Sequence, residues 1–159
     1  MLGGSRGMTL ARATADHACV VSIVPTVDPA PTLFVVDDDV PTLELLCEIA
    51  RDAGWSAHGF TRLSQLRRSL DTTTPAVLIL DDDLPDGRGG DAARELRSND
   101  RLADVPTLVC TAAHPMRRAE IGAWAPVIAK PFDLAEIEAF LGAVAHRQRP
   151  SDAQRHQAG

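Results

Sequence analysis

The side chains with the clearest chemical potential in this chain are acidic, and they stand directly after short apolar segments. Asp37 and Asp38 follow one such segment, and Asp81 follows another. Carboxylates crowded at ~4 Å cannot all stay ionised without a counter-charge, which a hard divalent cation such as Mg²⁺ supplies. Thr111 and Lys130 follow two later apolar segments and add a hydroxyl and an ammonium group.

These groups together suit the handling of a phosphoryl group. An ionised aspartate is a nucleophile toward phosphorus and gives an aspartyl phosphate. Mg²⁺ prefers oxygen ligands and is usually bound by one or two carboxylates together with substrate phosphate oxygens. The metal and Lys130 would offset charge on the phosphoryl oxygens, and Thr111 would donate a hydrogen bond to one of them. The residue types therefore predict a magnesium-dependent phosphoryl site.

Strands and helices are expected to alternate along residues 32–146. The expected strands are short and mostly apolar, and they cover residues 33–36, 56–58, 76–80, 107–110 and 127–129. Apolar residues at helical spacing predict helices between Pro41 and Gly54, near 62–70, 91–98 and 116–121, and after the capping box Asp133-x-x-Glu136. The alternation predicts an α/β, doubly wound (βα)5 fold whose parallel five-stranded sheet has the order 2-1-3-4-5. Ligands of such sheets bind beyond the carboxyl ends of the strands, where the polar groups stand.

Four short sequences make residues 32–146 resemble a response-regulator receiver domain of two-component signalling. In chain order they are Phe34-Val-Val-Asp-Asp38, Leu80-Asp-Asp-Asp-Leu-Pro-Asp-Gly-Arg-Gly89, Val109-Cys-Thr-Ala112 and Ala129-Lys-Pro-Phe132. Each is weak alone, but all four occur in order, at strand ends and at fitting intervals. The resemblance implies a flavodoxin-like fold and signalling by phosphorylation.

The resemblance also implies roles for the acidic residues. The phospho-acceptor of the family lies four residues before a proline, which makes it Asp81 before Pro85. The acidic pair Asp37 and Asp38 would bind Mg²⁺, Asp38 directly and Asp37 directly or through water. The third protein ligand of the metal would be the backbone carbonyl of Asp83.

The remaining family roles fall on the last two strand ends. Thr111 would be the switch hydroxyl, and Lys130 would contact the phosphate, with a cis bond between Lys130 and Pro131. Receivers often carry an aromatic residue three positions before the lysine, but here that position is Val127, which has no ring to move. Trp124 could substitute for that ring, although packing on the helix near 116–121 is the simpler expectation.

Other polar residues receive simpler interpretations. Asp39 and Asp82 are expected to be solvated or to lie near helix starts, without a direct role. Arg117 and Arg118 are expected on a solvated helix face, although that element contacts partners in receivers. Cys110 is expected to be a buried strand residue and not a redox switch.

The composition sets further limits. With a net charge of −6 the chain lacks the basic footprint of a nucleic-acid binder. The apolar run at 18–24 is too short for a membrane span of ~20 residues. Three cysteines without close pairing favour reduced thiols, so we expect a cytoplasmic protein. Residues 1–31 are expected to be a disordered extension and residues 147–159 a polar tail.

These observations predict a stand-alone response regulator. Too few residues follow Lys130 for an output domain, so output must pass to another protein, which the sequence does not identify. A sensor histidine kinase or histidine phosphotransfer protein would donate the phosphoryl group to Asp81, a homodimer is possible, and no enzymatic activity beyond self-phosphorylation and autodephosphorylation is expected.

Two alternatives stay open. The chain could be a receiver-like interaction module that works without phosphorylation, because the aromatic switch residue is missing at Val127. It could also be a haloacid-dehalogenase-like phosphatase, whose motif Asp81-x-Asp83 echoes. Against the phosphatase, the acidic pair precedes the nucleophile here, whereas in those enzymes it follows the lysine.

Overall fold

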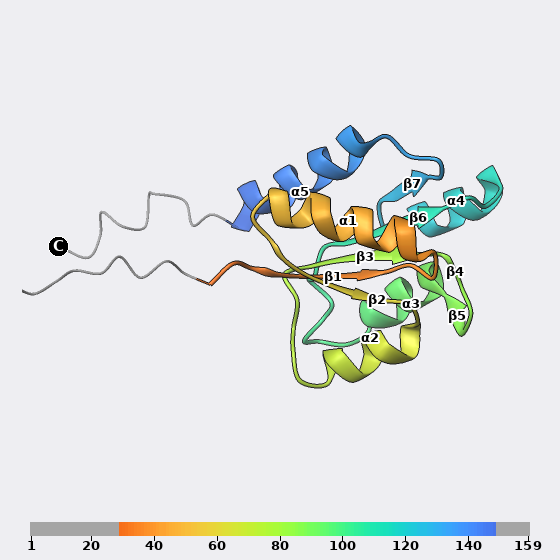
Figure 1. Ribbon diagram of the computed structural model, residues 1–159. Coiled ribbons are helices and arrows are strands. Elements are labelled where there is room, and N and C mark those ends of the chain that lie inside the picture. The colour runs from red at the N-terminus through yellow and green to blue at the C-terminus, as the bar shows by residue number, and fades with distance from the viewer. Residues whose placement is uncertain (1–28, 149–159) are drawn as a thin grey trace, which may run out of the picture.

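Five parallel strands form the central sheet of the computed structural model, which describes residues 29–148 (Figure 1). The strands are β1 (Thr32–Val36), β2 (Ser56–Phe60), β3 (Val77–Asp81), β6 (Thr107–Thr111) and β7 (Val127–Ala129). Their order is β2-β1-β3-β6-β7, which is the predicted order 2-1-3-4-5 because β4 and β5 form a separate small hairpin. The doubly wound (βα)5 prediction is therefore confirmed.

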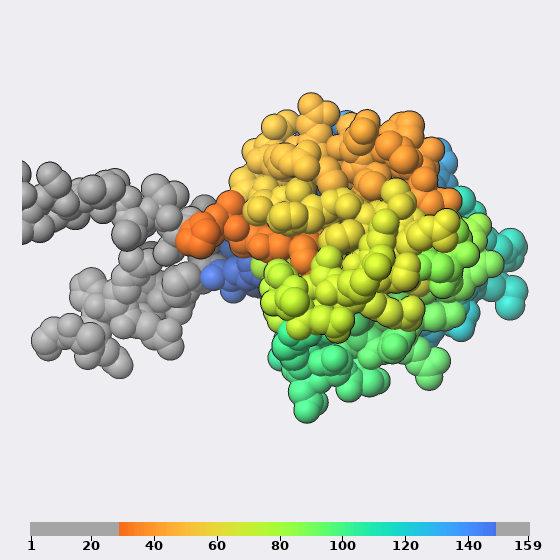
Figure 2. Space-filling model, turned by 60° about the horizontal axis from the view of Figure 1, so that its bottom comes forward, coloured from red at the N-terminus to blue at the C-terminus, as the bar shows by residue number. Residues whose placement is uncertain are grey.

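Helices cover both faces of the sheet (Figure 1). One face carries α1 (Val40–Asp52) and α5 (Leu134–Gln148). The other carries α2 (Leu63–Leu70) and α3 (Gly89–Leu96), while α4 (Pro115–Gly122) lies near the carboxyl ends of β6 and β7. In the space-filling view the edge strand β2 (yellow) lies between α1 (orange) on one face of the sheet and α2 (yellow-green) on the other (Figure 2).

The strands divide their side chains between two apolar cores, because successive residues of a strand point to opposite faces. Leu33, Val35 and Ile79 belong to the core under α1 and α5. Leu78 and Leu80 belong to the core under α2 and α3. Cys110 is buried on β6 as predicted, and this burial raises the pKa of its thiol to about 12.

The helix starts follow from local side chains. Asp39 is the N-cap of α1, and its carboxylate accepts a hydrogen bond from the Thr42 N–H. At α5 the predicted capping box is present: Asp133 accepts from the Ala135 N–H at 3.1 Å, and Glu136 accepts from the Asp133 N–H at 3.1 Å. The expectation that Asp39 lies near a helix start is confirmed.

The segment after β3 differs from the expected loop. It contains the hairpin β4 (Asp83–Leu84) and β5 (Gly87–Arg88), and α3 then begins at Gly89 instead of near residue 91. Two-residue strands are too short to show a periodic pattern, so the sequence did not indicate them. Gly89 lets this segment fold back tightly, because a Cβ there would overlap the carbonyl group of Asp81.

Two expectations fall mostly outside the described residues. Of the predicted extension at 1–31 the structure describes only 29–31, and of the predicted tail at 147–159 only two residues, which continue α5 to Gln148. Among the described residues, no helix is both long enough and apolar enough to cross a membrane.

Candidate functional site

Three carboxylates meet at the carboxyl ends of the neighbouring strands β1 and β3. Asp37, Asp38 and Asp81 each offer one oxygen, and these oxygens all lie within 4.8 Å of one another. Asp37 and Asp81 are buried, whereas Asp38 is exposed. Hard oxygen donors with one side open to water fit Mg²⁺, which keeps several water ligands when proteins bind it. The structure thus brings together the three predicted side-chain ligands.

Lys130 supplies the positive charge of this acidic cluster. It follows β7, and its Nζ lies 2.6 Å from Asp37 Oδ2 and 3.1 Å from Asp81 Oδ1. Burial opposes the charge of Lys130, but the hydrogen bonds to Asp37 and Asp81 outweigh it and raise the pKa of the ammonium group. Burial also raises the pKa of Asp81, although Lys130 acts in the opposite direction. The Lys130–Pro131 bond is cis, as the resemblance implied.

Thr111 ends β6 at the same edge of the sheet. The preceding residue, Cys110, pairs with Asp81 across the strands, and the Thr111 carbonyl accepts a hydrogen bond from the Lys130 N–H at 2.8 Å. The side chain of Thr111 is buried, and its Oγ1 accepts from the Ala113 N–H at 3.0 Å. The hydroxyl is therefore tied to the segment that leads into α4.

Asp83 differs from the other acidic residues of the predicted site. Its carboxylate lies 2.9 Å from Arg88 Nη1 across the small hairpin, and both side chains are exposed. The carboxylate of Asp83 is not one of the three that cluster. Metal binding by its backbone carbonyl stays a prediction.

The expectation of a solvated position is wrong for Asp82 and Arg117, although Asp82 does lie near the start of α3, which was the other part of its expectation. The Asp82 side chain is fully buried, and its carboxylate accepts hydrogen bonds from the Gly90 N–H at 2.9 Å, Arg117 Nε at 3.2 Å and Arg117 Nη2 at 3.1 Å. The available signal was strand alternation, because Asp82 shares its parity with Leu78 and Leu80 and so faces the core under α3. A carboxylate in that core needs a cation, and Arg117 supplies it from α4.

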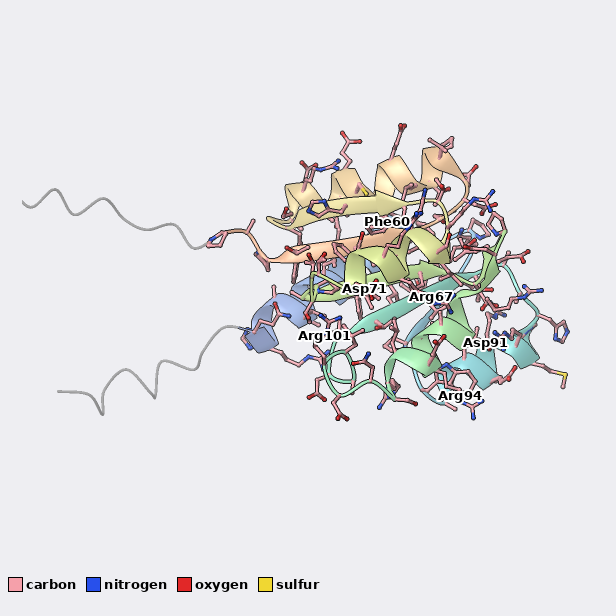
Figure 3. All side chains as sticks on the ribbon, turned by 90° about the horizontal axis from the view of Figure 1, so that it is seen from below. Phe60, Arg67, Asp71, Asp91, Arg94 and Arg101 are labelled. Carbon is pink, nitrogen blue, oxygen red and sulfur yellow. The ribbon has the colours of Figure 1, made fainter. Side chains whose placement is uncertain are left out.

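Trp124 also connects α4 to α3. It packs against the core around Ile121, in line with the simpler expectation. In addition its Nε1 donates to the Gly90 carbonyl at 2.9 Å, and the Arg94 guanidinium lies 5.4 Å from the ring centre. Asp91 and Arg94 lie along the same helix, α3, in Figure 3. The end of α4 is thus held against the start of α3.

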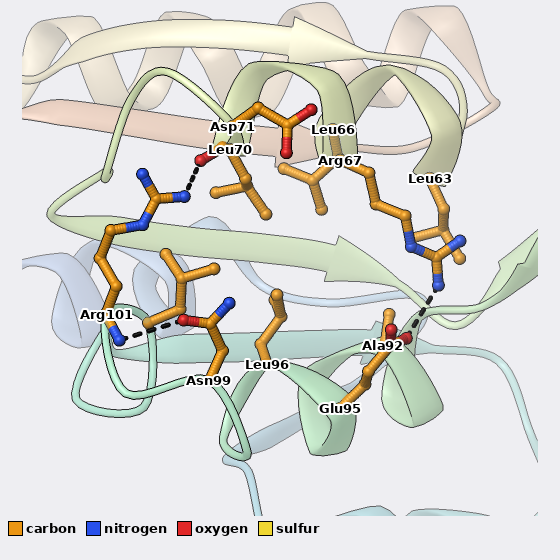
Figure 4. Close-up of a pocket in the computed structure, with 11 residues that line it drawn as sticks. Leu63, Leu66, Arg67, Leu70, Asp71, Ala92, Glu95, Leu96, Asn99 and Arg101 are labelled. Atoms are coloured by element: carbon orange, nitrogen blue, oxygen red, sulfur yellow. Dashed lines mark hydrogen bonds and ion pairs between the residues drawn. The ribbon is translucent and has the colours of Figure 1, made fainter.

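A cleft of about 230 Å³ opens between α2 and α3, away from the acidic cluster (Figure 4). Its floor is apolar and includes Leu66 and Leu96. The ion pair between Arg67 and Glu95 spans it at 2.9 Å, and Arg101 donates to the Leu70 carbonyl at its other end. Arg67 and Glu95 are thus paired with each other, and none of the residues that line the cleft belongs to the acidic cluster.

Comparisons with known proteins agree with this geometry. The pattern of the response regulator receiver domain family matches residues 33–141. The chain is 29% identical over 127 residues to the phosphate regulon transcriptional regulatory protein PhoB of Pseudomonas aeruginosa, covering 77% of this chain and 55% of that protein. It is 32% identical over 120 residues to the transcriptional regulatory protein GltR of the same species, covering 73% and 49%. The chain therefore spans about half the length of these curated relatives.

Solved structures show the same fold. A putative response regulator from Chloroflexus aurantiacus has a TM-score of 0.68 at 23% identity, covering 74% of this chain and 99% of that one. The receiver domain of a sensor histidine kinase from Pseudomonas aeruginosa has a TM-score of 0.65 at 22% identity, covering 73% and 98%. That structure holds a magnesium ion in its active site cleft. The match to the family pattern extends over all five strands of the sheet and includes the three carboxylates of the acidic cluster. This chain therefore belongs to the response regulator receiver domain family.

Proposed function

We propose that this chain is a response-regulator receiver that accepts a phosphoryl group on Asp81 and signals through contacts with other proteins. The observation that carries the proposal is the position of Lys130, whose ammonium group bridges Asp37 and Asp81 inside a three-carboxylate cluster. A cation beside a buried aspartate and a metal-binding acidic pair is the arrangement that stabilises a transferring phosphoryl group.

The transfer is a substitution at phosphorus. A carboxylate oxygen of Asp81 forms a bond to the phosphorus of a phosphohistidine on the donor protein. The phosphorus–nitrogen bond breaks, and the imidazole nitrogen keeps the electron pair and takes a proton from water. Asp37, Asp38 and Asp81 would hold Mg²⁺, which would supply electrostatic stabilisation of the phosphoryl oxygens. Lys130 contributes a second positive charge and holds Asp81 in place.

The donor and the output follow from the same proposal. A sensor histidine kinase or a histidine phosphotransfer protein supplies the phosphoryl group, and Mg²⁺ is the only cofactor. The phosphoryl group carries about −1.5 to −2 charges and replaces the single negative charge of the Asp81 carboxylate, so the net change at this buried edge of the sheet is at most about −1. This added charge biases the segment behind Thr111. Output passes to a partner protein, with a homodimer as one form, in the cytoplasm, without nucleic-acid or membrane binding and without activity on other substrates.

Intact-mass spectrometry tests this proposal. The protein is incubated with Mg²⁺ and acetyl phosphate, and one phosphoryl adduct is expected. Asp81→Asn should abolish the adduct. Asp83→Asn is the matched control, because its carboxylate pairs with Arg88 outside the cluster, so it should keep the adduct. An unmodified wild-type protein, or an adduct that persists in Asp81→Asn, would contradict the proposal.

A second candidate is an interaction module that works without phosphorylation. Val127 favours it, because this residue pairs with Val109 on β6 and has no aromatic ring that could follow a movement of Thr111. The same experiment separates the two candidates. A wild-type chain that binds Mg²⁺ but forms no adduct would support the interaction module.

A further inference from the structure

A partly buried ion pair connects the end of the strand that carries Asp81 to the first turn of α4. Asp82 follows the proposed acceptor directly and is fully buried. Arg117 is the third residue of α4 and donates two hydrogen bonds to the Asp82 carboxylate. Arg117 also contacts Asp91 at 2.9 Å and Glu120 at 3.0 Å. The guanidinium thus joins β3, α3 and α4.

The start of α4 is held from a second side by Thr111. The backbone N–H of Asp82 donates to the Cys110 carbonyl at 3.0 Å, which fixes Asp82 beside the end of β6. Thr111 Oγ1 accepts from the Ala113 N–H, two residues before α4 begins at Pro115. A movement of the Thr111 hydroxyl toward a phosphoryl group would free the Ala113 N–H and loosen this hold. The ion pair of Asp82 with Arg117 would then still hold the first turn of α4.

We propose that the Asp82–Arg117 ion pair is a latch that holds α4 in its unphosphorylated position and that phosphorylation at Asp81 must overcome. The inference rests on the proposed function. In this proposal Arg117 is a positioning residue, which holds α4 in place through its ion pair with Asp82.

The effect of the latch can be measured as a change in the affinity for a phosphoryl mimic. An interaction made only in the unphosphorylated arrangement lowers the affinity for anything that favours the other arrangement. Removing the ion pair must therefore raise the affinity for a phosphoryl mimic by the factor by which the pair had lowered it. Coupling between sites is typically about 5–150-fold. A latch-free variant should bind beryllofluoride, in the presence of Mg²⁺, at least about fivefold more tightly than wild type.

The experiment titrates the full chain with beryllofluoride in Mg²⁺ and follows the bound complex by ¹⁹F NMR. Asp82→Asn is the first variant, because its amide oxygen can still accept from the Gly90 N–H. The double variant Asp82→Asn with Arg117→Met removes both charges. The control Arg67→Met with Glu95→Gln removes an exposed ion pair between α2 and α3, far from α4, and should leave the affinity unchanged.

The outcomes are distinct. Tighter binding in both Asp82 variants, with the control unchanged, supports the latch. Unchanged or weaker binding in a folded Asp82→Asn protein overturns it, while wild-type binding keeps the proposed function intact. If the double variant does not fold, Asp82→Asn alone decides. Failure of the wild type to bind beryllofluoride or to form the acetyl phosphate adduct overturns the proposed function as well.

Discussion

Arg117→Met tests how much the ion pair between Arg117 and the buried Asp82 contributes to stability. The variant leaves the fully buried Asp82 carboxylate with a single hydrogen bond, from the Gly90 N–H at 2.9 Å. It removes the two bonds from Arg117 at 3.2 Å and 3.1 Å. Hydrogen bonds to charged groups contribute about 1.5–3 kcal/mol each, and breaking a buried ion pair by removing one partner costs about 3–5 kcal/mol.

That loss is large for a domain of this size. The free energy of unfolding of a single domain is about 5–15 kcal/mol, so a loss of about 3–5 kcal/mol is at least about a fifth of the total. Asp82→Asn should cost less, because an amide of the same shape leaves no buried charge. The double variant Arg117→Met with Asp82→Asn has no unpaired carboxylate charge in the core. Its loss of stability should therefore be smaller than the sum of the two single losses, by a coupling energy of about 0.5–3 kcal/mol.

Urea unfolding followed by far-ultraviolet circular dichroism measures these differences. With slopes of about 1–3 kcal/mol per molar urea, the Arg117→Met midpoint should fall by more than about 1 M while the slope is unchanged. The control Arg67→Met removes an exposed pair, which should cost at most about 1 kcal/mol. If Arg117→Met costs no more than this control, Asp82 finds another partner and the reasoning from burial is refuted.

Three further predictions concern the acidic cluster. Burial raises the pKa of Asp81, so its charge destabilises the metal-free fold at neutral pH, and Asp81→Asn should be more stable than wild type at pH 7. This difference in stability should vanish as the pH falls through the raised pKa toward 3.8. A constant difference across that range would argue against burial as the cause. The pKa of Lys130 is raised above 10.5, so its contribution to stability is complete below that pH and is lost as the pH rises through the folded pKa. Unfolding curves of the wild type should show this loss at high pH, and those of Lys130→Met should not. Mg²⁺ at 100 times its dissociation constant should raise the unfolding free energy by about 2.7 kcal/mol, and Asp37→Asn, measured alongside in the same thermal scans, should remove most of this gain; equal gains in both proteins would place the metal elsewhere.

The sequence predicted the sheet and the acidic cluster well, for a simple physical reason. Strands buried on both faces read as apolar runs, and the carboxyl ends of parallel strands meet at one edge. Residues that end such runs, among them Asp81 and Lys130, must therefore come close to one another. The structure confirms this for the side chains of the cluster, while the chemical roles stay predictions.

The parts that the sequence did not predict depend on tertiary packing. Asp82 looked like one more exposed acid in a run of three, because its burial depends on how α3 and α4 close over the strand end. Arg117 looked solvated, because a helix of eight residues carries too little pattern to show that one cation turns inward. The hairpin from Asp83 to Arg88 was missed because its strands have two residues each.

The two ends of the described chain leave the fold on the side opposite the acidic cluster (Figure 1). Pro29 leads into the amino end of β1, and Gln148 donates to the Ala76 carbonyl, which lies just before β3 begins. A fluorophore, an affinity handle or a surface tether attached at Pro29 or Gln148 would therefore stand about a full strand length from Asp81. Immobilised protein could thus be probed with kinases and candidate partners while the phosphoryl edge faces the solution.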